Sequence, residues 1–524
     1  MSSSTASRPP SPPSPPSRPS PSPCAATPGG DGTAFGPTVA AVAVAGALLP
    51  FSVTGAAVAL PRMAEQLGAS TGAAQWVQNA FNVAFAALPL AAGSLADRTG
   101  RRRVLLGGIA LAGSAALLVG LAPSILWADL ARAVQGCGAA AVLASGAAVL
   151  AHATSGRRRG FAFGVLGAAF GSGLALGPLA AGAMVELAGW RSVFLLIAAL
   201  SGPAWLCARQ APESRGPGTG AFDVAGAAVF TLGLACLSCV FVRAATAGWA
   251  APSTLGLLAA ALTLVAGFAV LEARRGERAM FDVRLFRRPE FVAVVCQPFT
   301  VTLGFVVLLV DLPGYLQGVG GRGTFTTGLL LLPLTLPVLV LPLLGGRLAA
   351  CTSVRTVLTG SSLLIATGAL LLPLLTPGSS WPVLACPLLP FGLGVGLAFG
   401  VMDDAAVGTV PVEQAGAAAG IFNTMRITGE SVAVAGTAAF LTTLTGAGLR
   451  ARHVPATEAG RLAGRAVQGQ VADGRRAVLA EALTSSFHTL GLVLAALSLL
   501  GALLTYLALS PVRGRIAASS RPMS

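Results

Sequence analysis

Residues 93–103 of the chain read GSLADRTGRRR and join two apolar stretches, 73–96 and 103–122. Gly100 permits a tight turn, and Asp97 can accept hydrogen bonds from the N-terminus of a neighbouring helix. The arginines can meet anionic lipid headgroups at the inner surface of a membrane. Because a loop that only followed the charge bias of membrane proteins would need neither Asp97 nor the glycines, the segment predicts a structured connection between two membrane-spanning helices.

The composition of the whole chain supports a membrane protein. Of its 524 residues, 54% are hydrophobic and only 10% are charged. A soluble protein of this composition would need one very large core, whereas cores stop growing at roughly 250–300 residues. Lipid is therefore the expected solvent of this chain.

Fourteen apolar stretches are long enough to cross a bilayer, which takes roughly 20 residues. Their approximate extents are 37–60, 73–96, 103–122, 125–151, 159–186, 190–208, 222–243, 252–272, 291–316, 325–346, 354–375, 381–406, 415–443 and 484–509. We expect residues 1–34, which are rich in Pro and Ser, to be a disordered cytoplasmic tail with no cleavable signal peptide. Residues 511–524 are expected to form a second cytoplasmic tail.

The net charge of +15 comes from 34 arginines and 19 acids, without any lysine. A nucleic-acid-binding protein would gather such charge on one soluble face, but here it lies in short clusters between apolar stretches. With a cytoplasmic N-terminus, inner segments hold 22 of the 34 arginines, and most outer ones lie in a long loop, 444–483. This bias predicts a multi-pass protein of the cell membrane with both termini in the cytoplasm and no nucleic-acid partner.

An internal repeat divides the chain into two similar parts. Glycines 160, 164 and 173 recur at 416, 420 and 429, and the block that starts at Gly93 recurs at Gly346, with offsets of 256 and 253. Duplicated helical bundles are common in transporters. The repeat predicts two six-helix bundles, 35–208 and 291–510, which are separated by two inserted helices and a cytoplasmic linker in 209–290.

Two further motifs lie inside apolar stretches. Arg132 lies deep in the fourth stretch, where a charge costs at least about 2.5–3.5 kcal/mol and needs a partner or a water-filled cavity. Asp129, three residues earlier on the same helix face, is a candidate partner, and a neutralised pair within one helix would be a purely structural arrangement.

The fifth stretch combines a Gly-Pro pair with spaced small residues, which predicts a bent and tightly packed helix. This motif consists of Gly164, Gly173, Gly177, Pro178 and Gly182.

These three blocks resemble motifs of the major facilitator superfamily, and the resemblance covers about residues 35–510. Together with Gln75-Trp76-Val77, Trp190-Arg191, 423–429 and the fourteen stretches, they are similar to the fourteen-helix drug:proton antiporter branch. The resemblance implies an all-α major facilitator fold and a proton-coupling role for Arg132, and it implies that the Gly-Pro motif belongs to antiporters. It also implies that one segment latches the two bundles together. We call this segment the cytoplasmic latch, which comprises Gly93, Asp97, Arg98, Gly100, Arg101 and Arg102.

The first apolar stretch departs from that branch. Where its members usually carry an Asp followed by an Asn, this chain has Ser52 and Ala57. Either proton coupling uses other acids, or the substrate differs from the cation that is typical of the branch. Ser52 is therefore a candidate cavity residue.

The acids within the apolar stretches are the remaining candidates, because each is costly in lipid. Asp311 lies towards the outer end of its stretch, and Glu430 lies four residues after Arg426, with which it can form either a static pair or part of a coupling site. Asp403 and Asp404 are expected to be solvated at a cytoplasmic helix end. The candidate residues for proton coupling and the substrate cavity are Asp129, Arg132, Asp311, Arg426, Glu430 and Ser52.

The sequence therefore predicts a proton-coupled antiporter that exports amphipathic organic compounds, such as antibiotics or secondary metabolites, by alternating access. An exporter dedicated to one endogenous metabolite is the alternative, and a polytopic membrane enzyme is disfavoured because the loops hold no polar catalytic cluster. We expect a monomer that meets only its substrate and the bilayer. We also expect no cofactor other than the coupling proton, and no metal, because the eight cysteines and three histidines are not clustered.

Overall fold

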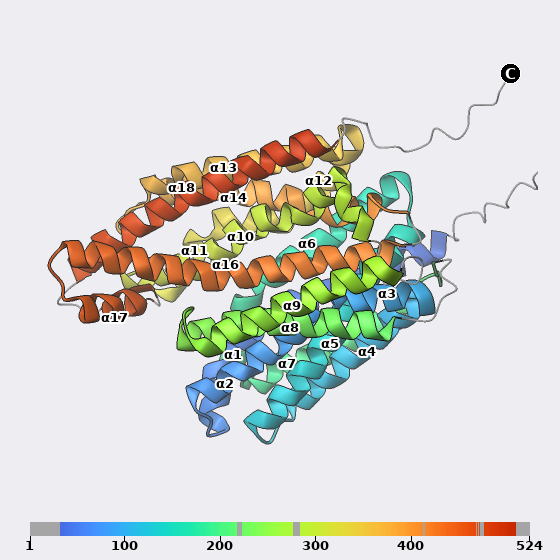
Figure 1. Cartoon of the computed structure of the whole chain (residues 1–524), viewed down its shortest axis with the longest axis horizontal. Coiled ribbons are helices and arrows are strands. Elements are labelled where there is room, and N and C mark those ends of the chain that lie inside the picture. The colour runs from blue at the N-terminus through green and yellow to red at the C-terminus, as the bar shows by residue number, and fades with distance from the viewer. Residues whose placement is uncertain are drawn as a thin grey trace, which may run out of the picture.

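The computed structural model describes residues 32–216, 223–275, 283–411, 414–467, 469, 471 and 476–509. Within these residues, helices are the only regular secondary structure, as the all-α prediction requires. The predicted tails lie outside the described residues, apart from residues 32–34, with which the first helix begins. Figure 1 shows long helices that run roughly side by side along the longest axis of the molecule.

The N-terminal half contains seven helices. They are α1 (Gly32–Gln66), α2 (Thr71–Ala87), α3 (Pro89–Thr99), α4 (Arg101–Gly120), α5 (Ile125–Ala153), α6 (Gly156–Ala188) and α7 (Arg191–Ala208). The side chains of Ser70 and Ser124 cap α2 and α5 by accepting hydrogen bonds from amides in the first turns. Helices α2 and α3 are consecutive and are bent by 49° relative to each other. The bend falls at Pro89, whose ring has no amide hydrogen to continue the helix.

Two inserted helices follow, α8 (Val224–Ala247) and α9 (Pro252–Arg275), and a 3-10 helix, η2 (Val283–Arg287), leads into the C-terminal half. That half contains α10 (Pro289–Gly318), α11 (Thr324–Leu330), α12 (Leu332–Cys351), α13 (Val354–Leu371), η3 (Leu372–Leu374), α14 (Trp381–Phe399), α15 (Met402–Gly408), α16 (Ala415–Ala451), α17 (Ala456–Val467) and α18 (Arg476–Ala508). Figure 1 shows the two halves as separate groups of helices that meet along α3, α6, α12 and α16.

Twelve helices in the described residues are long and apolar enough to cross a membrane, or thirteen if the bent pair α2 and α3 counts as one span. The thirteenth predicted stretch, 415–443, also lies in a helix, the 37-residue α16. The number of fourteen spans stays a prediction. The structure differs from the predicted long loop at 444–483, because α16 continues to Ala451 and the amphipathic helix α17 follows it.

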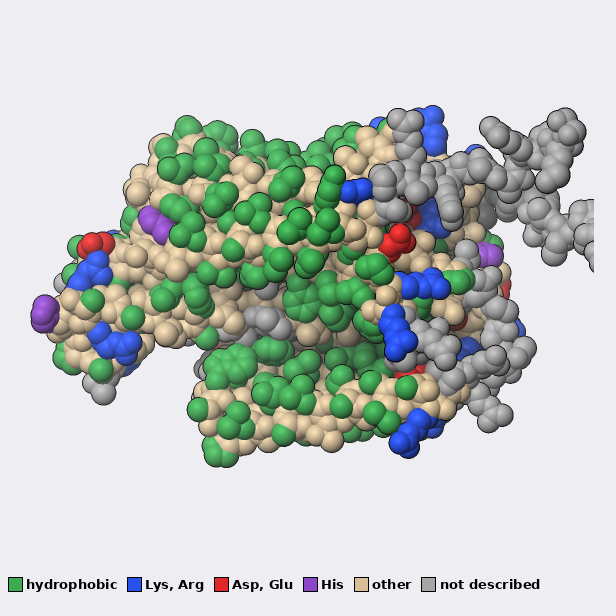
Figure 2. All heavy atoms as spheres, turned by 45° about the horizontal axis from the view of Figure 1, so that its top comes forward, with side chains coloured by type: hydrophobic (Ala, Val, Ile, Leu, Met, Phe, Trp, Pro, Cys, Tyr) green, Lys and Arg blue, Asp and Glu red, His purple; other side chains and the backbone are tan. Residues whose placement is uncertain are grey.

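Polar and apolar side chains are separated along the molecule. Figure 2 shows basic side chains towards the two ends and hydrophobic side chains over the surface between them. Large apolar side chains are exposed on the described helices, among them Leu179 at 71% and Leu507 at 69%. Such a surface would be unfavourable in water, so it is the part of the molecule that faces lipid.

The repeat is visible in the contacts between the halves. A Cβ atom on Gly416 would lie 2.5 Å from the carbonyl oxygen of Gly93, and one on Gly160 would lie 3.0 Å from that of Gly346. Gly346 is the repeat equivalent of Gly93, and Gly416 is that of Gly160. The two contacts are therefore equivalent, and each of them lets the backbones of two helices approach closely.

The next turn of each helix repeats the relationship. A Cβ atom on Gly164 would lie 2.9 Å from the carbonyl oxygen of Pro342, and one on Gly420 would lie 2.5 Å from that of Pro89. Pro89 and Pro342 are separated by the same 253 residues as Gly93 and Gly346. The pairs α3–α16 and α6–α12 therefore form two matching seams between the halves.

Candidate transport site

The cytoplasmic latch joins the two halves through Asp97, near the end of α3. One carboxylate oxygen accepts a hydrogen bond from the amide of Gly416 at 3.0 Å, and the other accepts one from the amide of Ala417 at 3.0 Å. Both amides belong to the first turn of α16, where free N–H groups and the helix dipole favour a negative charge. Asp97 therefore stabilises the contact between α3 and α16.

Arginines of the latch hold Asp97 and the turn after it. Arg101, which is 1% exposed, donates from Nε to Asp97 at 2.9 Å. Arg102 donates to the carbonyl oxygen of Ala211 at 3.1 Å, and its amide donates to Glu213 at 3.1 Å. Gly100 has a φ of 127°, a conformation that favours glycine. Sequence reasoning missed Glu213, which lies more than 100 residues from the latch and has no local signal.

A second ion pair joins the halves near the latch. Arg159, at the start of α6, pairs with Asp404 on the short helix α15. The expectation that Asp403 and Asp404 are solvated is wrong for Asp403, which is 7% exposed, whereas Asp404 keeps 29% of its side chain exposed beside Arg159. The chain turns at Gly400 and Val401, so α15 carries both acids back into the protein, where arginines neutralise them.

The Gly-Pro motif of α6 packs against two helices. A Cβ atom on Gly173 or Gly177 would collide with α1, and Gly164 packs against α12 in the other half. Gly182 has open space around it in the described residues, so packing does not explain a glycine there. Pro178 lies within the helix. The motif therefore brings α6 close to both α1 and the C-terminal half.

Arg132 forms the centre of a buried polar group in the N-terminal half. Its side chain is fully buried and donates to the Ser52 hydroxyl at 2.7 Å, to Gln135 Oε1 at 2.8 Å and to the Val77 carbonyl at 3.0 Å. The guanidinium also lies 4.1 Å from the centre of the Phe81 ring. The structure thus brings two of the predicted candidates, Arg132 and Ser52, into direct contact.

The expected pair of Arg132 with Asp129 does not form among the described residues. Arg132 reaches across to α1 and α2 instead of along its own helix. One carboxylate oxygen of the half-buried Asp129 is buried without a hydrogen-bond partner in the described part of the chain. The three-residue spacing allowed the pair, but packing between helices determined where the long arginine side chain points.

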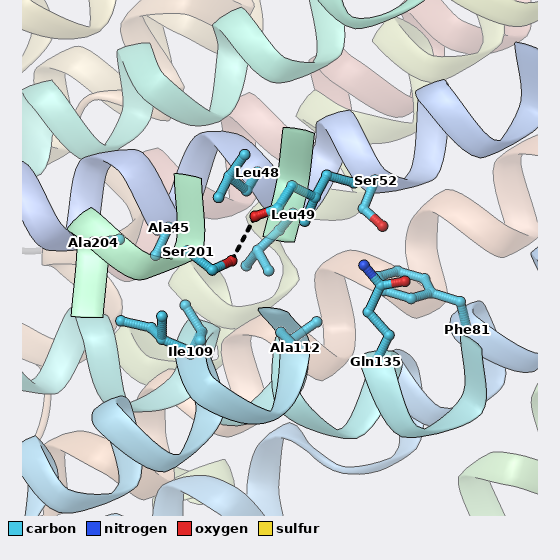
Figure 3. A pocket seen from close by; sticks show the side chains of 13 residues that line it. Ala45, Leu48, Leu49, Ser52, Phe81, Ile109, Ala112, Gln135, Ser201 and Ala204 are labelled. Atoms are coloured by element: carbon cyan, nitrogen blue, oxygen red, sulfur yellow. Dashed lines mark hydrogen bonds between the residues drawn. The ribbon is translucent and has the colours of Figure 1, made fainter. Parts of the chain in front are cut away.

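A small cavity lies beside this group, within the N-terminal half. It has a volume of about 20 Å³, which is enough for one water molecule. Figure 3 shows Ser52, Phe81 and Gln135 at one end of this cavity and Ser201 at the other. The other lining residues are apolar, and two of the three polar ones, Ser52 and Gln135, contact Arg132.

Arg426 occupies a comparable position in the C-terminal half, on α16. It donates to both carboxylate oxygens of Asp403, at 2.6 and 2.7 Å, and both side chains are buried. The expected ion pair between Arg426 and Glu430 does not form among the described residues. Asp403 replaces Glu430 as the partner because the turn before α15 brings it beside α16, which the sequence pattern did not predict.

The Arg426 group also touches the other half. Its guanidinium lies 4.9 Å from the ring of Phe170 on α6 and 4.8 Å from that of Phe422 on α16. Phe170 in turn meets Phe399 edge to face, with ring centres 6.0 Å apart. A change in the charge of this group therefore acts directly on the contact between the halves.

Comparison with known proteins agrees with this architecture. The sequence model of the Major Facilitator Superfamily matches residues 42–434. The chain belongs to this superfamily. As a major facilitator protein it is a multi-span transporter of the cell membrane and not an enzyme.

Its relatives include proteins of antibiotic resistance and export. The puromycin resistance protein pur8 of Streptomyces alboniger is 34% identical over 388 residues, which are 72% of this chain and 76% of that protein. A probable actinorhodin transporter of Streptomyces coelicolor is 30% identical over 432 residues, 78% of this chain and 74% of that protein. The solved structure of the proton:xylose symporter XylE has a TM-score of 0.57 at 13% identity and covers 88% of this chain and 95% of its own, which shows the shared fold.

All three candidate acids for proton coupling have a buried carboxylate oxygen without a hydrogen-bond partner in the described residues, namely Asp129, Asp311 and Glu430. Glu213 and Asp223 also have such an oxygen, but each of these two acids forms an ion pair with an arginine. Buried polar atoms are normally paired, so an unpaired one calls for a functional explanation. The structure does not bring Asp311 into contact with the other candidates among its described hydrogen bonds and ion pairs. No group of three or more His, Cys, Asp or Glu side chains in the described residues could hold a metal ion.

Proposed function

We propose that the protein is a proton-coupled antiporter that exports amphipathic organic compounds by alternating access, with both termini in the cytoplasm. Unpaired carboxylate oxygens at Asp311 and Glu430 are the observation that carries the coupling. An ionised carboxylate is costly inside a membrane, so such a group exchanges a proton readily when its surroundings change. The proton is the coupling ion, and one chain is the transport unit.

Alternating access requires contacts between the halves that form in one state and break in the other. The ion pair of Arg159 with Asp404 and the hydrogen bonds of Asp97 to α16 are contacts of this kind. All of them lie at the end of the molecule to which the sequence assigns the cytoplasm. They would hold that end closed while the other end admits protons and releases substrate.

The relatives support the class of substrate. One relative is described as a puromycin resistance protein and another as a probable actinorhodin transporter, so both are associated with small organic compounds of microbial origin. The lining of the small cavity beside Arg132 combines apolar side chains with a few polar groups, a pattern that would suit an amphipathic ligand once the helices around it move apart. We therefore assign an antibiotic or secondary metabolite as the cargo.

The test is transport by the purified protein in liposomes with an imposed pH gradient. We expect accumulation of an amphipathic dye to require the gradient, and we expect Glu430→Gln and Asp311→Asn to lower its rate. Glu186→Gln is the matched control, because Glu186 is an exposed acid on α6. Transport that ignores the gradient, together with unchanged rates for both variants, would contradict proton coupling.

A dedicated exporter of one endogenous metabolite is the second candidate, and the probable actinorhodin transporter among the relatives favours it. Competition separates the two candidates. A multidrug exporter should be inhibited by several unrelated amphipathic dyes, whereas a dedicated exporter should be inhibited only by compounds that share one scaffold.

A further inference from the structure

The two buried arginines of the transport site differ in how their charges are neutralised. Arg426 is paired with Asp403 at 2.6 Å. Arg132 is fully buried, and no ion pair to it is found among the described residues. Because arginine keeps its proton in proteins, Arg132 brings a full positive charge into the N-terminal half.

The acids of the N-terminal half do not compensate this charge. Residues 35–208 contain only four acids, and all of them are described. Asp97 pairs with Arg101, the exposed Glu65 pairs with Arg62, and Glu186 is exposed. The fourth acid, Asp129, is one helical turn away but forms no ion pair with Arg132 among the described contacts.

The groups that do contact Arg132 are neutral. They are the Ser52 hydroxyl, the Gln135 amide oxygen and the Val77 carbonyl. The Nη2 atom has no hydrogen-bond partner in the described residues. Hydrogen bonds and the Phe81 ring reduce the cost of burying the guanidinium, but a buried ion without a counter-ion remains unfavourable. A ligand with a negative charge would offset that cost.

Resting on the proposed function, we propose that Arg132 binds the anionic group of the exported compound, so that the cargo is a monoanion such as an amphipathic carboxylate or ionised phenol. Three residues that contact the guanidinium also line the cavity shown in Figure 3, namely Ser52, Gln135 and Phe81, and the anionic group would reach Arg132 from this side. The remaining lining of this cavity is mostly apolar and accepts the hydrophobic part of the compound. Ser52 leaves the charge of Arg132 free for the ligand.

Access to this site requires movement of α1. Pro50 lies inside α1, two residues before Ser52, and proline removes a helical hydrogen bond at its position. The hydrogen bond that Pro50 cannot donate is the one to the carbonyl of Gly46, so the turn between these two residues is the weakened one. Bending at Pro50 would separate Ser52 from α5 and enlarge the cavity of about 20 Å³.

Ser52→Asp tests the proposal, because it places a fixed carboxylate beside Arg132. Ser52→Asn has the same size without the charge, so it is the matched control. The probes are pyrenebutyrate and its neutral methyl ester, and binding to purified protein in nanodiscs is measured by energy transfer from tryptophan. Gluconate is the only other anion in the buffer.

We expect wild-type protein to bind pyrenebutyrate about tenfold more tightly than the ester, and Ser52→Asp to weaken pyrenebutyrate binding about tenfold relative to Ser52→Asn. Without any probe, Ser52→Asp should unfold at a higher temperature than Ser52→Asn, because its carboxylate neutralises a buried charge. Equal binding by the two variants, or equal affinity of the wild type for acid and ester, would overturn the proposal. Displacement of pyrenebutyrate by millimolar chloride would show an inorganic ligand and would also overturn it.

The binding assay uses no pH gradient, so its result is independent of proton coupling. Anion-selective binding without gradient-driven transport would leave the ligand assignment standing and reject the coupling mechanism. Gradient-driven transport of a cationic dye, together with equal binding of pyrenebutyrate and its ester, would support proton coupling and reject the anionic ligand. The two proposals can therefore fail separately.

Discussion

Asp97 accepts a hydrogen bond from the backbone amide of Gly416, 319 residues away in the sequence, at 3.0 Å. The same two helices touch at Gly93, whose carbonyl oxygen lies against Gly416. A charge at a helix N-terminus and a close backbone contact thus act at one place. The contact between α3 and α16 depends on both, and each can be removed separately.

Asp97→Asn should weaken the closed state. The amide side chain of Asn still accepts one hydrogen bond, but it carries no charge. Arg101, which is 1% exposed, therefore loses its carboxylate partner. Hydrogen bonds to charged groups contribute about 1.5–3 kcal/mol, so we expect a fall of about tenfold or more in the transport rate in liposomes. Glu290→Gln, an exposed acid on α10, is the control. A wild-type rate for Asp97→Asn would show that the latch does not limit transport.

Gly93→Ala tests the backbone contact. A Cβ atom at this position would overlap the backbone of Gly416, which cannot move without shifting α16. Overpacking of this kind typically costs about 1–3 kcal/mol. We expect a lower unfolding temperature in detergent and slower transport. Gly107→Ala on α4 has open space around it and should lower neither quantity, because alanine favours a helix more than glycine does. Similar losses in both variants would mean that the contact with Gly416 is not responsible.

The repeat shows how much of the fold could be predicted from the sequence. Its offsets made Gly93 equivalent to Gly346 and Gly160 equivalent to Gly416, and the structure packs these glycines against one another between the halves. Apolar length predicted most helices for the same reason, since lipid restricts what a span can contain. Repeats and spans are properties of whole segments and are therefore readable in a sequence.

The sequence did not predict the hydrogen-bond and ion-pair partners of individual charged side chains. Spacing along a helix favoured Asp129 for Arg132 and Glu430 for Arg426, but the structure provides Ser52 and Asp403. Spacing identifies neighbours on one helix only. Arginine side chains are long enough to reach other helices, and the turn at Gly400 that places Asp403 lies inside an apolar stretch without a clear break signal.

Asp223 predicts a dependence of stability on pH. Burial raises the pKa of its carboxyl, but the amide of Gly226 and the Arg275 guanidinium outweigh burial and hold the pKa below its usual range. Its contribution is therefore complete above the unfolded-state pKa of about 3.9 and is lost as the pH falls through the folded-state pKa. We expect Asp223→Asn, which can still cap α8, to unfold at a lower temperature than wild type at pH 6, and we expect this difference to shrink as the pH falls below about 3.9. A difference that does not change as the pH is lowered would assign the effect to shape instead of charge.

Asp403→Asn should be much more harmful than the same change at its neighbour. It leaves the Arg426 guanidinium, which is 2% exposed, without a counter-ion, and breaking a buried pair costs about 3–5 kcal/mol. Asp404→Asn is the matched control on the same helix. Its partner Arg159 has 24% of its side chain exposed, so water compensates part of the loss, and we expect about 1 kcal/mol or less. Unfolding temperatures in detergent measure both variants.

The double variant Asp403→Asn with Arg426→Gln separates charge from packing. Removing both charges should recover part of the stability that Asp403→Asn loses, because no ion is then buried alone. The rings of Phe170 and Phe422 still pack against the shortened side chain at 426, so the halves keep their apolar contact. If the double variant is as unstable as Asp403→Asn, the geometry of the pair determines stability. If it is folded but transports slowly, the ion pair takes part in the transport cycle beyond holding α15 against α16.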